Sequence, residues 1–182
     1  VRHSNIPMLV FHDIRIEYEG FIAQMDFILI TKTSVYILET KRLSGDIEVT
    51  STGDFIRNIK DINGALIKRE GMYSPITQSQ RQASILRQLL MDHLDFPGEL
   101  IIRPLVVIAN PKSIVDLSKA PISIKDSIIK YDQLIRNLRE SEYKLENQPR
   151  FKESLMESMA DVILHYDMPK KVDYNAKYGL AV

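Results

Sequence analysis

Two carboxylates and a lysine are spaced along the sequence in a way that could bind a metal ion. Asp26 lies in a run of alternating residues, and Glu39 and Lys41 end the next run. Side chains on a strand repeat with period two, so Gln24 and Asp26 should share a face with Ile28. A turn around residues 32–33 then places Asp26 opposite Glu39 and Gln24 opposite Lys41.

This arrangement creates an electrostatic cost that a cation would remove. Opposed residues on antiparallel strands have Cβ atoms about 4.5–5.5 Å apart. Two carboxylates about 5 Å apart repel by roughly 3 kcal/mol at an effective dielectric near 20. Lys41 offsets one of the two negative charges of Asp26 and Glu39. A divalent ion bound by both offsets the rest, and oxygen ligands favour Mg²⁺ or Mn²⁺.

Such an ion would favour chemistry at a phosphodiester. It polarises a phosphoryl oxygen and lowers the pKa of a coordinated water. Lys41 could orient that water or neutralise charge on the phosphate, and Gln24 could position either. The alternative is a cross-strand salt bridge on a solvated face, with Asp26, Glu39 and Lys41 as surface residues. Apolar residues on both faces of these two strands argue against a solvated face.

Period-two alternation and turn residues predict the elements that hold these side chains. Residues 23–31 and 35–41 carry apolar side chains on both faces, which is typical of strands in the middle of a covered sheet. A helix is expected at 75–93, with Ser74 as its N-cap and Pro75 in its first turn. Further strands are expected at 12–18, 46–50, 105–109 and within 55–71 around Asn63-Gly64, and further helices at 131–141 and 150–165.

Strands followed by alternating helices and a strand indicate an α/β fold, with a central mixed β-sheet flanked by helices. We expect one domain over residues 1–166 and a tail or linker over 167–182. The 182 residues are 45% hydrophobic and 26% charged, as in ordinary globular proteins. The absence of cysteine excludes disulfides and thiolate metal sites and favours a reducing, cytoplasmic location.

Charge and hydropathy bound the possible partners. No apolar run reaches the roughly 20 residues that span a bilayer, so no membrane partner is expected. The formal net charge of zero is not that of a nucleic-acid coat protein, although a catalytic domain needs only a local basic patch. Basic residues exceed acidic ones between residues 54 and 90, where they could contact phosphates or form a solvated surface. They are Arg57, Lys60, Lys68, Arg69, Arg81 and Arg87.

Three segments of the chain resemble the nuclease-related domain (NERD) family of the PD-(D/E)xK restriction-endonuclease-like superfamily. Residues 23–27 (Ala-Gln-Met-Asp-Phe) are similar to its Ala-Gln-Ile-Asp-His run. Residues 35–41 and the following 44–47 are similar to its Glu-Thr-Lys strand and the glycine after it. Residues 74–78 (Ser-Pro-Ile-Thr-Gln) are similar to its Asn-Pro-x-x-Gln helix start. Phe27 and Ser74 depart from the family's His and Asn.

The resemblance implies a restriction-endonuclease-like fold and a Mg²⁺- or Mn²⁺-dependent nuclease acting on DNA. Asp26 and Glu39 match the metal ligands, Lys41 matches the catalytic lysine, and Gln78 matches a glutamine that faces the site. Superfamily members commonly carry one more acidic residue on a helix before the first strand, upstream of this sequence. The alternative is a nucleic-acid-binding or regulatory module that keeps the fold without cutting.

Overall fold

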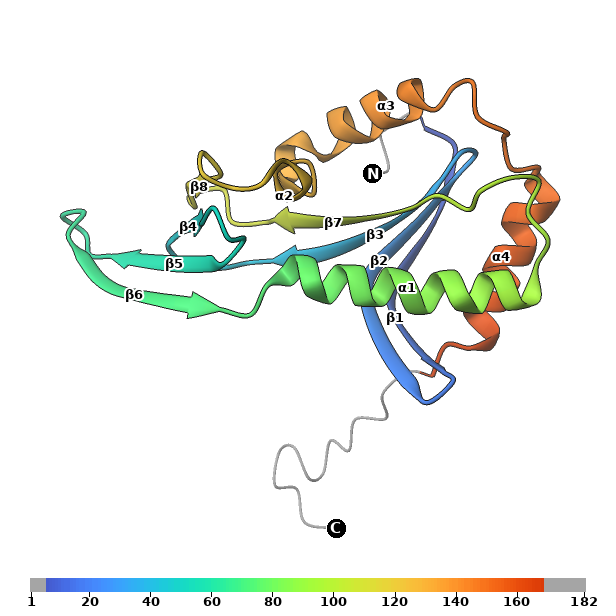
Figure 1. Ribbon diagram of the computed structural model, residues 1–182, viewed down its shortest axis with the longest axis horizontal. Coiled ribbons are helices and arrows are strands. Elements are labelled where there is room, and N and C mark those ends of the chain that lie inside the picture. The colour runs from blue at the N-terminus through green and yellow to red at the C-terminus, as the bar shows by residue number, and fades with distance from the viewer. Residues whose placement is uncertain (1–5, 169–182) are drawn as a thin grey trace, which may run out of the picture.

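The centre of the molecule is a five-stranded sheet in the order β1-β2-β3-β7-β9, described by a computed structural model over residues 6–168 (Figure 1). β1 (Met8–Tyr18), β2 (Phe21–Thr31) and β3 (Val35–Lys41) are antiparallel neighbours. β7 (Ile102–Ile108) pairs in parallel with β3, and β9 (Ile128–Lys130) pairs in parallel with β7. The predicted α/β fold with a central mixed sheet is therefore confirmed.

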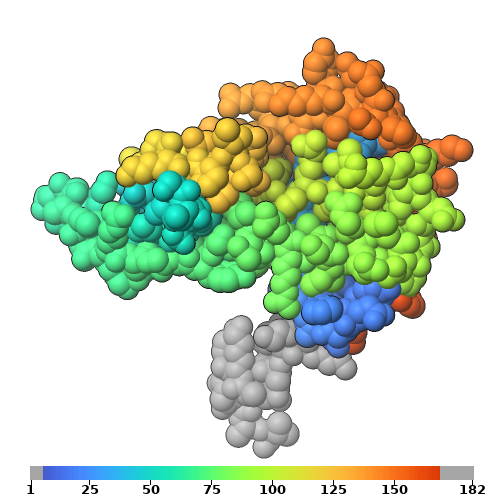
Figure 2. Space-filling view, in the orientation of Figure 1, coloured from blue at the N-terminus to red at the C-terminus, as the bar shows by residue number. Residues whose placement is uncertain are grey.

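A second sheet of four strands extends from the body in the order β6-β5-β4-β8. It contains β4 (Asp46–Val49), β5 (Phe55–Lys60), β6 (Leu66–Met72) and the short β8 (Val115–Asp116). β5 and β6 form the hairpin expected around Asn63-Gly64, and this hairpin projects beyond the rest of the molecule (Figures 1 and 2). The sequence predicted the strands of this hairpin but not that they belong to a separate sheet.

The helices cover both faces of the five-stranded sheet. α1 (Pro75–His93) has the bounds that the sequence predicts, and Ser74 Oγ caps it by accepting the Thr77 N–H at 3.3 Å. The remaining helices are α2 (Ile122–Lys125), the 3₁₀ turn η1 (Tyr131–Gln133), α3 (Leu134–Lys144) and α4 (Glu153–His165). α1 and α3 lie on opposite sides of the sheet (Figure 1).

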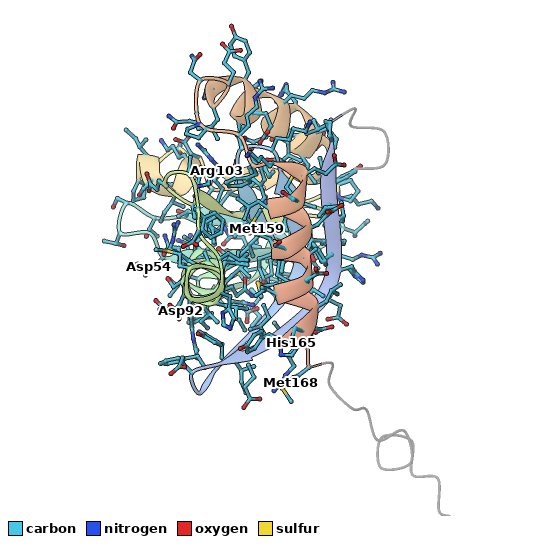
Figure 3. All side chains as sticks on the ribbon, turned by 90° about the vertical axis from the view of Figure 1, so that its right-hand side faces the viewer. Asp54, Asp92, Arg103, Met159, His165 and Met168 are labelled. Carbon is cyan, nitrogen blue, oxygen red and sulfur yellow. The ribbon has the colours of Figure 1, made fainter. Side chains whose placement is uncertain are left out.

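Three apolar cores form among the described residues, and two of them lie on opposite faces of the five-stranded sheet. Leu86 and Leu89 of α1 and Met159 of α4 are fully buried in the first core, and Figure 3 labels Met159 on α4. Leu138 of α3 packs with Tyr36 in the second core. The strands between these cores are apolar on both faces, as their sequences predict.

The last described residues return to β1. The Met168 N–H donates to the Arg15 carbonyl at 2.7 Å, and Ile16 forms an isolated antiparallel bridge with Asp167. Residues 169–182, most of the segment predicted as a tail or linker, lie outside the described residues. Among residues 6–168, none of the helices has the length and apolar character needed to cross a bilayer.

In both β1 and β2 the apolar residues switch from one face of the sheet to the other. The switch occurs at neighbouring positions of the two paired strands. Met25 and Ile28 of β2 both lie in the core beneath α1, although strict alternation would place them on opposite faces. In β1, Phe11 and Ile14 both pack in that core, and Asp13 between them has a left-handed φ of 56°. The pleat is therefore interrupted on both strands beside the site.

This interruption corrects the expected orientation of one candidate residue. Gln24 does not share a face with Ile28, because Ile28 lies in the core beneath α1 whereas Gln24 is exposed. The alternation that predicts a shared face holds within each half of β2 but not across the interruption. Asp26 lies at the interruption itself.

Candidate active site

Glu39 and Lys41 lie at the end of β3, whose alternation places them with Val35 and Ile37 on the face covered by α1. Glu39 is only 4% exposed, and the Lys41 Nζ donates to its Oε1 at 2.6 Å. A buried carboxylate is costly unless it is paired and hydrogen-bonded. The ion pair with Lys41 therefore offsets part of the free-energy cost of burying the Glu39 carboxylate.

Asp26 approaches the same end of β3 through Thr40. Its Oδ2 accepts the Thr40 backbone N–H at 2.7 Å and the Thr40 hydroxyl at 2.6 Å. The predicted β2–β3 register is confirmed from Phe27–Leu38 to Ile30–Val35, but the pairing ends there. The expected direct pairing of Asp26 with Glu39 is absent, and the Asp26 carboxylate instead binds a β3 backbone N–H.

Two glutamines of α1 complete the site on the side where this helix covers the sheet. Gln78 and Gln82 are four residues apart, so they lie on one face of the helix. The Lys41 Nζ donates to Gln78 Oε1 at 3.3 Å, and Gln82 Nε2 donates to Glu39 Oε2 at 3.0 Å. Gln82 Nε2 also donates to the Gln24 backbone carbonyl at 2.6 Å. The two amides therefore connect α1 to both strands that carry the carboxylates.

Gln82 is a site residue that the sequence interpretation missed. It is 4% exposed, and its Oε1 is buried without a hydrogen-bond partner among residues 6–168. The signal was present, because an amide recurs four residues after Gln78 on the apolar face of a helix. A polar side chain on such a face must find a partner.

Gln24 contributes its backbone rather than its side chain. Its side-chain amide is exposed and donates to Asp13 Oδ1 at 2.9 Å, so it does not lie beside Lys41 as expected. The reason is the interrupted pleat, which turns this part of β2 relative to β3. The carbonyl of Gln24 still reaches the site, where it accepts from Gln82.

The carboxylates are stabilised by protein donors, which offset the repulsion expected between them. Asp26 is bound by Thr40, and Glu39 by Lys41 and Gln82. Within residues 6–168 there is no group of three or more His, Asp or Glu side chains able to hold a metal ion. The oxygen ligands available at the end of β3 are the two carboxylates and the unpartnered Gln82 Oε1. Such a set suits Mg²⁺ or Mn²⁺, which keep several waters.

Most of the basic residues counted between positions 54 and 90 have partners within the chain. Arg57 and Lys68 pair with Glu70, and the Arg87 guanidinium donates to the Leu100 carbonyl. The Glu70 carboxyl has a pKa below its usual range because Lys68 and Arg57 hydrogen-bond to it. Lys60 pairs with Asp46 at 2.8 Å and Arg69 with Glu48 at 3.1 Å. The projecting hairpin is therefore largely charge-neutralised.

The first part of the chain is similar to a known protein family. Residues 2–109 match the family model described as nuclease-related domain, NERD. This match covers more than half of the chain and includes Asp26, Glu39, Lys41 and the two α1 glutamines. No curated protein and no solved structure shows significant similarity to the chain.

Proposed function

The chain belongs to the nuclease-related domain family, and on this premise we propose that it is a metal-dependent nuclease that hydrolyses phosphodiester bonds in DNA. The observation that carries the proposal is the buried Glu39–Lys41 pair, held by Gln78 and Gln82 next to Asp26. An isolated surface salt bridge would not need two helix amides or a carboxylate that is 4% exposed. Residues arranged for stability alone would more simply be apolar here.

Lys41 is the residue proposed to act on the phosphate. Its ammonium has three donors, of which one binds Glu39 and another Gln78. The third can donate to a non-bridging phosphate oxygen and stabilise the charge that develops there. Gln78 keeps the ammonium in place, and Gln24 acts through the carbonyl that anchors Gln82.

Asp26 and Glu39 are the residues proposed to hold a divalent cation, Mg²⁺ or Mn²⁺. When bound, such an ion would neutralise phosphate charge and make a coordinated water a better nucleophile. The protein keeps both carboxylates at the end of β3 without the ion, since Thr40 binds one and Lys41 with Gln82 binds the other. The site is thus preorganised, and binding needs little rearrangement of the strands.

A second candidate function is a nucleic-acid-binding module that does not cut. One observation favours it: both carboxylates are already hydrogen-bonded to protein donors, and no third acidic or histidine ligand lies near them in the described part of the chain. In this alternative, the Glu39–Lys41 pair and the two amides serve only to join α1 to the sheet.

Cleavage of supercoiled plasmid DNA tests the proposed function. We expect the purified chain to nick DNA with Mg²⁺ or Mn²⁺ and to lose this activity in EDTA. Lys41→Met keeps the apolar stem but removes the ammonium, and should lower the rate by about 10²–10³-fold. Lys32→Met, at an exposed position in the β2–β3 turn, is the matched control and should cut normally. Cleavage that survives both EDTA and Lys41→Met would contradict the proposal.

Metal-dependent melting separates the two candidate functions. An ion at a hundred times its dissociation constant stabilises the native state by about 2.7 kcal/mol. We expect Mn²⁺ to raise the melting temperature of the wild type and to have little effect on Asp26→Asn. In that variant the amide oxygen can still accept from Thr40, so the metal-free fold should change little. DNA binding without any Mn²⁺ effect or cleavage would favour the non-catalytic module.

A further inference from the structure

A separate polar cavity of about 430 Å³ lies on the face of the five-stranded sheet opposite the candidate active site. Its floor is β7, from Ile102 to Leu105, and α3 lies on its opposite side. The segment between α2 and β9 forms one wall. Tyr36 also lines the cavity, and Tyr36 is on the face of β3 away from Glu39 and Lys41.

Arg103 is the feature of this cavity that requires an explanation. It pairs with Tyr36 in the β3–β7 register, so both side chains lie on the same face (Figure 3 labels Arg103, below α3 in that view). The Arg103 Nε–H is buried and has no hydrogen-bond acceptor among residues 6–168. Buried N–H groups, above all those of a cation, are normally hydrogen-bonded. The missing partner points to a bound anion.

The Tyr36 hydroxyl does not serve as that partner. It donates to Glu142 Oε1 at 3.0 Å, and burial raises the pKa of Tyr36 to about 12. The positive charge of Arg103 partly opposes this rise. Tyr36 therefore stays neutral at physiological pH and does not offset the charge of Arg103.

The remaining lining residues indicate the chemistry of the ligand. Lys125 and Lys144 add two further cations, and Asn137 and Ser141 of α3 supply an amide and a hydroxyl. A guanidinium presents a planar set of donors that matches two oxygens of a phosphate. The cavity also has two carboxylates, Asp126 and Glu140, which accept hydrogen bonds and so suit the hydroxyl groups of a ligand but not additional negative charge.

We propose that this cavity binds a phosphate monoester that carries hydroxyl groups, the class that includes nucleoside monophosphates. Arg103 binds the phosphate, Lys144 adds positive charge, and Asp126 and Glu140 accept from the sugar hydroxyls. The cavity has the volume of a small-molecule site. The proposal is independent of nuclease activity, because no lining residue belongs to the candidate active site.

Calorimetric titration of the full chain with AMP and with inorganic phosphate, at constant ionic strength, tests the proposal. We expect saturable binding of AMP, at least about tenfold tighter than that of phosphate. Arg103→Met should weaken AMP binding by more than about tenfold. Arg150→Met, at an exposed arginine before α4, is the matched control and should bind AMP normally. Lys144→Met alters a cavity residue that is itself exposed, and should weaken binding several-fold without affecting folding.

Three results would overturn the proposal. The first is the absence of saturable AMP binding, which would mean that water alone solvates Arg103. The second is equal loss of binding in Arg103→Met and Arg150→Met, which indicates nonspecific charge attraction. The third is equal affinity for AMP and phosphate, which rules out recognition of the sugar. If Arg103→Met fails to fold, unchanged binding by Lys144→Met would count against the cavity.

Discussion

At the scale of single residues, Gln82 determines how the candidate active site is held together. Glu39 has two carboxylate oxygens, of which Lys41 satisfies one and Gln82 the other. The same amide nitrogen also satisfies the Gln24 carbonyl. One side chain thus supports a buried anion and a backbone acceptor near Asp26, and its loss would remove this donor from one Glu39 oxygen and from the Gln24 carbonyl.

Gln82→Leu should destabilise the fold by about 2–3 kcal/mol, because the buried Glu39 Oε2 and the part-buried Gln24 carbonyl both lose their Gln82 donor. The measurement is the free energy of unfolding in urea. DNA cleavage should also fall, since Glu39 loses the contact that orients it. Gln80→Leu changes an exposed glutamine of the same helix and should alter stability by less than about 0.5 kcal/mol. Equal effects of the two changes would show that Gln82 has no special role.

At the scale of elements, the β3–β4 turn depends on a glycine that the sequence singles out. Gly45 follows the Glu-Thr-Lys segment and has φ of 90°. A Cβ built on it would lie 2.5 Å from the Asn58 carbonyl oxygen of β5. Two independent constraints, backbone conformation and close approach, therefore exclude a side chain. This turn begins the second sheet.

Gly45→Ala should destabilise the protein by about 2–4 kcal/mol, combining left-handed strain with a backbone clash. Thermal and urea unfolding would measure the change. Gly71→Ala, in the exposed β6, is the matched control, since a Cβ there meets no atom within 4 Å. That substitution should change stability by less than about 1 kcal/mol. A tolerant Gly45 would mean that the turn can move away from Asn58.

Elements with strong local signals could be predicted from the sequence, and those set by distant partners could not. Ser74 and Pro75 fix the start of α1, and its predicted bounds are confirmed. β8, α2 and β9 have only two to four residues each, too few for a periodic pattern, and the sequence interpretation missed them. β8 and β9 pair with strands that lie far away along the chain, so tertiary contacts define these two strands.

The candidate site follows the same division. The face of Glu39 and Lys41 could be predicted, because β3 alternates regularly to its end. The surroundings of Asp26 and Gln24 could not, since they depend on an interrupted pleat shared with Asp13 of the neighbouring strand. Period-two reasoning has no means of detecting a left-handed residue on another strand.

At the scale of the whole molecule, the family match ends before the fold is complete. It covers residues 2–109, whereas α3 and α4, which pack on opposite faces of the five-stranded sheet, come later in the chain. α4 supplies Met156, Met159 and Ile163 to the core beneath α1, and α3 supplies Leu138 to the opposite core. Glu142 of α3 further accepts hydrogen bonds from hydroxyls of the β2–β3 turn, among them Thr31 and Thr33.

A chain ending at residue 109 should therefore not fold cooperatively. Each fully buried apolar side chain contributes about 1.5–3 kcal/mol, and the three from α4 alone approach the usual net stability of 5–15 kcal/mol. Circular dichroism and thermal unfolding would test this. A chain ending at residue 168 keeps every described element and is the control. A sharp unfolding transition in the 109-residue chain would show that the family segment is self-sufficient.

The return of the chain to β1 has a consequence for protein synthesis. The Arg15 N–H donates to the Asp167 side chain across 152 positions of sequence, so β1 is synthesised well before the segment that pairs with it. Translation at about 5–20 residues per second makes that interval roughly 8–30 s. During this time the apolar face of β1 to β3 beneath α4 has left the ribosome without its cover. Nascent chains of this protein should therefore be substrates for chaperones that shield apolar strands until α4 emerges.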